Sequence, residues 1–182
     1  KIMTTYIALL RGINVSGKNI IKMVELKQLF KNEGFNNVTT YIQSGNILFD
    51  SNETSITKLE QTITDLIKKQ FGHSIKILVL TKDYLNKVFI SNPFLKIETI
   101  NPKALYVILL KNNYFAEGIK DLEPYLTNNE EFKIIDNCAY IHYPNSAGNS
   151  KLTINIFEKK LKTTGTSRNW RTITKLVELS NQ

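Results

Sequence analysis

The sequence has 182 residues, of which 42% are hydrophobic and 22% are charged, a composition typical of a folded globular protein and not of a disordered chain. No stretch approaches the roughly 18 apolar residues of a membrane-spanning helix, and the first residues lack the pattern of a secretory signal, so we expect neither membrane insertion nor secretion. The net charge of +8 comes from the two ends, where residues 1–50 carry six Lys and Arg against three Asp and Glu and residues 151–182 carry seven against two, which favours an anionic ligand.

The first half of the chain predicts the element order β-α-β-β-α-β. The predicted elements are a strand at 6–10, a helix from Lys22 to Gly34, strands at 38–43 and 47–49, a helix from Thr54 or Ser55 to Gly72, and a strand at 75–80. Continuous apolarity indicates the first strand, helical spacing of apolar residues indicates the helices, and the Ser-Gly-Asn sequence at 44–46 indicates a tight turn. This is the split βαβ order of ferredoxin-like domains.

The second half repeats much of this pattern after a short helix at 81–92 and a connector at 92–102. The predicted elements are a strand at 104–110, a helix near 115–125, strands at 132–135 and 139–143, and a helix at 152–161. A last helix is predicted to open at 166–170, with Thr166 or Ser167 as its cap. We therefore predict an α+β fold of two ferredoxin-like units packed together, residues 3–92 and 93–182, with an added C-terminal helix.

Two polar segments, at 11–19 and 40–46, follow predicted strands in the first half. Because the crossover through the first helix makes the first two strands parallel, both segments should emerge at one edge of the sheet. Glycines permit positive φ or a close backbone approach, and Arg and Lys supply cationic donors. The candidate ligand-binding residues are Arg11, Gly12, Asn14, Lys18, Lys22, Tyr41, Gln43, Ser44, Gly45 and Asn46.

Arg168 and Asn169 are two further candidates. In the first turn of the predicted last helix, Arg168 would face the positive end of the helix dipole, so a negative group should lie nearby. Alternatively, Asn14 and Asn46 satisfy only loop backbone, and Arg11 forms a structural salt bridge. If these residues bind a ligand, Arg11→Ala and Asn46→Ala leave the fold intact and abolish binding, whereas unfolding of both variants supports a structural role.

Cysteine and histidine are scarce in this chain. Cys138 is the only cysteine, which fits a reducing cytoplasm, and without a partner cluster it is interpreted as a packed residue. The only histidines, His73 and His142, lack the neighbouring carboxylates that would complete a metal site. We expect a cytoplasmic protein with no metal and no cofactor.

Several of these segments together resemble a known family. The runs YIALLRGINV, KM at 22–23, TYIQSGN, SKL at 150–152 and TSRNWRT are similar to those of a widespread bacterial family that is known only as domain of unknown function 1697. The resemblance extends from Met3 to the last helix and implies a cytoplasmic α+β protein of two ferredoxin-like units without an established activity. Ser16 stands where a glycine is common in the family, which argues against a strictly glycine-based phosphate cradle.

Three functions fit these observations. The first is binding of an anionic ligand, a nucleic acid or a nucleotide, as many sheets of this kind bind RNA. The second is an enzyme acting on a small phosphorylated metabolite, although neither polar segment contains Asp, Glu, His or Cys for acid-base chemistry. The third is a structural or protein-interaction module without a small-molecule site. We predict anion binding; catalysis, the ligand and the oligomeric state stay open.

Overall fold

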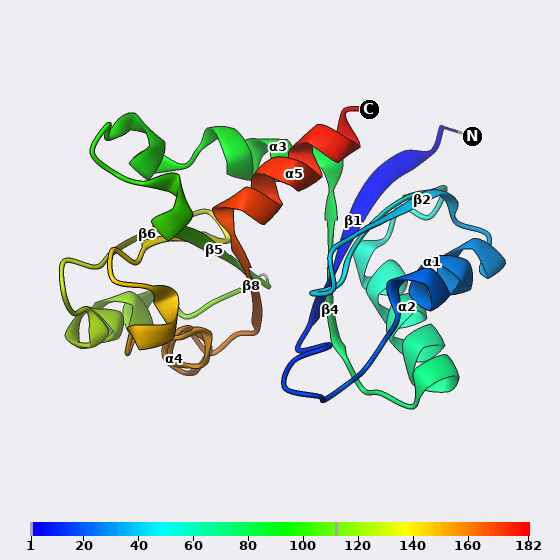
Figure 1. Ribbon diagram of the computed structural model, residues 1–182, viewed down its shortest axis with the longest axis horizontal. Coiled ribbons are helices and arrows are strands. Elements are labelled where there is room, and N and C mark those ends of the chain that lie inside the picture. Colours follow the sequence, from blue (N-terminus) through cyan, green and yellow to red (C-terminus); the bar gives the residue numbers. More distant parts are fainter. Residues whose placement is uncertain (1, 112) are drawn as a thin grey trace. The chain divides into compact units, whose positions relative to one another are not determined.

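The computed structural model describes residues 2–111 and 113–182, which divide into two compact units (Figure 1). Unit 1 comprises the chain up to Asn86 together with Leu176–Gln182, and unit 2 comprises Lys87–Lys175. Each unit contains one four-stranded sheet in which all neighbouring strands are antiparallel. The predicted α+β class, with two βαβ-type units and a C-terminal helix, is confirmed. Within the described residues, no helix is long and apolar enough to cross a membrane.

Unit 1 has the predicted β-α-β-β-α-β order, with the strands arranged β2-β3-β1-β4 in the sheet. Its elements are β1 (Thr4–Arg11), α1 (Met23–Asn32), β2 (Asn36–Tyr41), β3 (Asn46–Ser51), α2 (Ile56–Phe71) and β4 (Lys76–Thr81), followed by α3 (Lys82–Ile90), which continues into unit 2. Both β1 and β2 pair antiparallel with β3, so they run parallel to each other and end at the same edge of the sheet.

One face of this sheet packs against α1 and α2. Alternation along β1 directs Tyr6 and Ala8 into a core that also contains Phe30 of α1 and Ile63 of α2. The α2 helix begins where Ser55 Oγ accepts a hydrogen bond from the Lys58 N–H, and it ends at Gly72 in the left-handed conformation, as the sequence predicts.

Unit 2 arranges its strands in the equivalent order β6-β7-β5-β8. Its main elements are β5 (Leu105–Leu110), the 3₁₀ helix η3 (Ala116–Tyr125), β6 (Glu131–Ile135), β7 (Cys138–His142), α4 (Ile154–Leu161), β8 (Gly165–Asn169) and the beginning of α5 (Trp170–Ser180), with short 3₁₀ turns at η1 (Pro93–Lys96), η2 (Pro102–Ala104) and η4 (Ala147–Asn149). The core between this sheet and η3 and α4 includes Ile108, Leu122, Ile141 and Phe157.

The segment at 165–169 differs from its prediction. It is the strand β8, paired with β5 from Tyr106 to Leu110, and it completes the second four-stranded sheet. Thr166 and Ser167 therefore do not cap the last helix; the Asn169 Oδ1 accepts the Thr172 N–H at 2.9 Å instead. Because Arg168 lies in a strand, the helix-dipole argument for an anion beside it is wrong.

The helix predicted near 115–125 is a 3₁₀ helix. Its apolar residues Ile119, Leu122 and Tyr125 recur every three positions, which matches the three residues per turn of a 3₁₀ helix. Gly118 permits close contact with α4, since a Cβ at this position would lie 2.0 Å from the Lys160 carbonyl oxygen.

Candidate functional site

The two polar segments of unit 1 lie together, as the sequence predicts. The Asn14 Nδ2 donates a hydrogen bond to the Gln43 carbonyl at 2.8 Å, which joins the loop after β1 to the turn after β2. We call this region, the loop at 12–22 together with the turn at 42–45 and the adjoining strand ends, the polar edge of unit 1.

Asparagine side chains hold the loop in a closed shape. The Asn14 side chain donates to the Ile21 carbonyl and accepts from the Ile21 N–H, both at 2.9 Å. The Asn19 Nδ2 donates to the Gly12 carbonyl at 2.9 Å. Between these bonds the chain makes a tight turn through Ser16 and Gly17, both at positive φ. The loop is thus internally bonded before any ligand is present.

The turn at 42–45 packs directly on the loop. Gly45 has φ +84°, and a Cβ there would lie 2.6 Å from Ile13 Cδ1, so the position requires glycine. Asn46 is fully buried, and its Nδ2 donates to the Tyr41 carbonyl and to Ser44 Oγ at 2.9 and 3.1 Å.

These bonds separate positioning residues from residues that can reach a ligand. The two N–H groups of the Asn14 amide, and those of the Asn46 amide, are engaged within the loops. Gly12, Lys18 and Gln43 are exposed. Lys22 is also exposed, and its Nζ lies 3.9 Å from the Glu25 carboxylate, a separation that makes a weak surface pair.

Strand register places Arg11, Tyr41 and Asn46 on one face of the sheet. Leu9 and Tyr41 each pair with Asn46, and Arg11 lies two residues beyond Leu9, on the same side. Arg11 is half-buried and Tyr41 is half-buried.

Two residues near the polar edge were missed by the sequence analysis. Lys76, an exposed residue at the start of β4, pairs directly with Arg11 in the β1–β4 ladder. The His73 Nε2 lies 3.3 Å from the Ile20 carbonyl oxygen of the loop. The split βαβ order places the fourth strand beside the first, so counting residues back along that strand would have found Lys76.

Arg168 and Asn169 lie in unit 2, whereas the other candidates lie in unit 1. Arg168 pairs with Val107 and Asn169 with Tyr106, so their side chains leave opposite faces of the sheet. Arg168 is buried, its Nη1 donates to the Ser167 carbonyl at 2.8 Å, and burial lowers the pKa of its guanidinium to about 10. Asn169 accepts the Thr172 N–H at the start of α5.

A family model described as "protein of unknown function (DUF1697)" matches residues 3–140. The chain belongs to this family. The predicted family is therefore confirmed over residues 3–140, and its description names no activity. The motifs at 150–152 and 166–172, which the sequence analysis also assigned to the family, lie beyond the matched residues.

No curated protein sequence matches the chain. Among solved structures, a conserved bacterial protein, SP0830 from Streptococcus pneumoniae, is similar with a TM-score of 0.75 and 22% identity, over 98% of this chain and 99% of that one. At this identity the similarity shows a shared fold and no shared function.

Proposed function

We propose that the polar edge of unit 1 binds an anionic ligand, a nucleic acid or a nucleotide. The observation that carries the proposal is the pairing of Arg11 with Lys76 at the end of the β1–β4 ladder, beside the loop held by Asn14. Side chains directly opposite in an antiparallel pair lie about 5 Å apart at Cβ. One phosphate group can therefore contact both cationic side chains at once.

Each group at the polar edge then has a distinct role. The planar guanidinium of Arg11 is suited to bidentate contact with phosphate, while Lys76 and Lys18 act as point charges. Tyr41, on the same face as Arg11, offers an aromatic surface on which a base can stack. Asn14 and Asn46 hold the backbone in place and do not contact the ligand directly.

The test is fluorescence anisotropy with labelled single-stranded RNA and DNA at low and at physiological salt. We expect binding that weakens steeply with salt, because phosphate contacts release counterions. Lys76→Ala should weaken binding to both nucleic acids about equally and reduce the salt slope by about one. Arg11→Ala should have a larger effect, because it removes bidentate contact.

Lys31→Ala is the matched control. Lys31 is exposed in the last turn of α1, and its substitution removes the same positive charge as Lys76→Ala. Binding that is absent at low salt, or that falls equally in Lys31→Ala and Lys76→Ala, would contradict the proposal.

A small phosphorylated metabolite is the second candidate, and His73 favours it. The two polar segments contain no side chain for acid-base chemistry. The imidazole of His73, which lies beside the Ile20 carbonyl of the loop, supplies such a group. Thermal-shift screening of phosphorylated metabolites tests this function. A rise in Tm that is lost in Lys76→Ala supports ligand binding, and turnover that is lost in His73→Gln while binding persists supports an enzyme. A protein that binds neither class of anion would be the interaction module.

A further inference from the structure

The sheet edges of the two units are protected to different degrees. At β4, the Glu60 carboxylate accepts the Val79 N–H at 3.0 Å, and at β8 the Glu158 carboxylate accepts the Gly165 N–H at 3.0 Å. The edge strand β2 has an irregular register between Asn36 and Thr39. Such devices prevent an edge from pairing with another strand.

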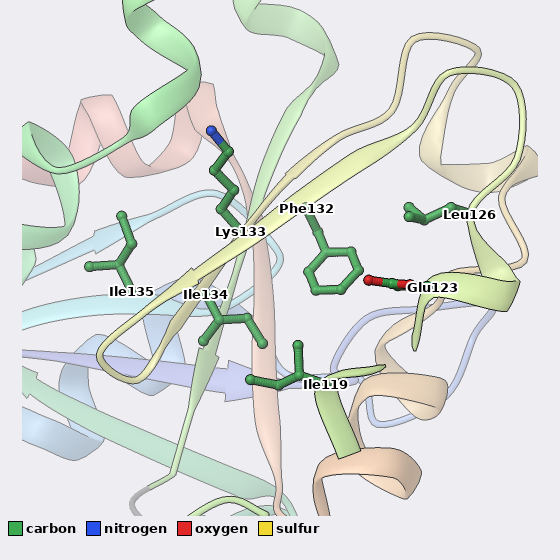
Figure 2. A pocket seen from close by; sticks show the side chains of 7 residues that line it. All are labelled: Ile119, Glu123, Leu126, Phe132, Lys133, Ile134 and Ile135. Carbon is green, nitrogen blue, oxygen red and sulfur yellow. The ribbon is translucent and has the colours of Figure 1, made fainter. Parts of the chain in front are cut away.

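The edge strand β6 has none of these protections among the described residues. Its register with β7 is unbroken from Glu131 to Ile135. Beside it lies an open groove of about 580 Å³ between β6 and η3 (Figure 2). The residues that line the groove are Ile119, Glu123, Leu126, Phe132, Lys133, Ile134 and Ile135. A regular edge next to an apolar groove is the arrangement to which an extended strand adds.

The hairpin fixes which backbone groups of β6 face outward. Ile135 and Cys138 flank a two-residue turn, and residues in that position exchange hydrogen bonds with each other. Alternation along an antiparallel ladder then directs the N–H and C=O groups of Phe132 and Ile134 away from β7. A strand added at this edge must therefore pair with Phe132 and Ile134.

The side chains alternate in the same way. Phe132 and Ile134 pack against the core on the side of η3, and Figure 2 shows Lys133 pointing away from Ile134 and Ile119. The Lys133 Nζ lies 5.8 Å from the centre of the Phe94 ring on the other face. Glu131 shares this face with Lys133, and both are exposed.

We propose that β6 pairs antiparallel with β6 of a second copy of the chain, about a two-fold axis at Phe132. In this register the two Phe132 residues exchange backbone hydrogen bonds, and Glu131 of each copy lies opposite Lys133 of the other. This axis meets two requirements. The backbone groups of Phe132 that it uses face away from β7, and opposite charges meet at positions 131 and 133. An axis at Lys133 would also pair the outward-facing backbone groups, Phe132 with Ile134, but it fails on charge because it places the two Lys133 residues opposite each other.

The test is sedimentation velocity of the full chain between about 10 μM and about 1 mM, because a short ladder gives a weak interface. We expect the wild type to dimerise with rising concentration. Glu131→Lys and Lys133→Glu should each weaken dimerisation at least about tenfold, since each creates two like-charge pairs. An equimolar mixture of these two variants should recover the wild-type affinity, because every cross-strand pair is again of opposite charge.

Lys103→Glu is the matched control, an exposed charge reversal in η2 that should leave dimerisation unchanged. Circular dichroism checks that all variants fold. A wild type that stays monomeric at about 1 mM overturns the proposal and leaves the edge to another polypeptide. Dimerisation that Lys133→Glu does not weaken, or that the mixture does not restore, overturns this register.

Discussion

In both units a backbone hydrogen bond joins the end of the first strand to the turn of the following hairpin, and we call this shared arrangement the frame. The side chains around the frame differ between the units. In unit 1 the Leu10 N–H donates to the Gly45 carbonyl at 2.9 Å, and in unit 2 the Leu110 N–H donates to the Asn137 carbonyl at 2.8 Å. The next position is Asn46 in unit 1, paired with Leu9, and Cys138 in unit 2, paired with Leu109. Both side chains are buried.

This difference distinguishes the polar residues of unit 1 from the backbone arrangement that both units share. Unit 2 closes the hairpin with the two residues Asp136 and Asn137 and places a thiol behind them. Unit 1 uses a longer turn, a buried amide and a loop bonded through Asn14 at the same place. Unit 2 forms the frame without a buried amide at this position. The polar residues of unit 1 are therefore not required by the frame, which favours a specific role for them.

The largest expected effect is that of Gly118→Ala in unit 2. The added Cβ would lie 2.0 Å from the Lys160 carbonyl oxygen, and backbone must move to accept it. We expect the free energy of unfolding, measured in urea, to fall by about 3 kcal/mol or more. Gly148→Ala is the control, because its nearest neighbour is Ser146 Oγ at 3.8 Å. Equal stability of the two variants would mean that η3 does not pack closely on α4.

Asn46→Ala is expected to have the next largest effect, in unit 1. The substitution removes a fully buried amide and leaves the Tyr41 carbonyl without that donor, which costs about 2 kcal/mol. The sequence analysis expected this variant to leave the fold intact; the burial of Asn46 now predicts a folded but less stable protein. Asn145→Ala removes an exposed amide bound to the Asn128 carbonyl and should cost less than about 0.5 kcal/mol. Similar losses in both variants would indicate that the Asn46 bonds contribute little.

The sequence predicts local features better than long-range ones. Ser55 and Gly72 mark the ends of α2, and the parallel course of β1 and β2 correctly predicts that the polar segments meet. The strand β8 was missed because its polar residues become a strand only by pairing with β5, over fifty residues earlier in the chain. The burial of Asn46 could not be predicted for the same reason. The residues that cover it come from β1 and β2, and the residues next to it in the sequence do not reveal them.

Cys138 occupies in unit 2 the position that Asn46 occupies in unit 1, and its thiol reports on the burial of that position. Burial raises the pKa of the Cys138 thiol to about 12, so its thiolate form is scarce at pH 8. Because the pKa is higher in the folded protein than in the unfolded chain, the stabilising contribution of the neutral thiol is complete below about pH 8.5 and is lost as the pH rises toward 12. Stability should therefore fall over that range in the wild type more than in Cys138→Ala.

At pH 8, labelling of Cys138 by a disulfide reagent should be on the order of 1,000-fold slower in the native protein than in denaturant. Asn46→Cys in a Cys138→Ala background carries the same probe into unit 1. If the two units are equivalent at this position, the thiol at 46 reacts as slowly as the thiol at 138. Faster labelling at 46 would show that the turn at 42–45 opens more readily than the hairpin of unit 2, which is the behaviour expected if ligands enter at the polar edge.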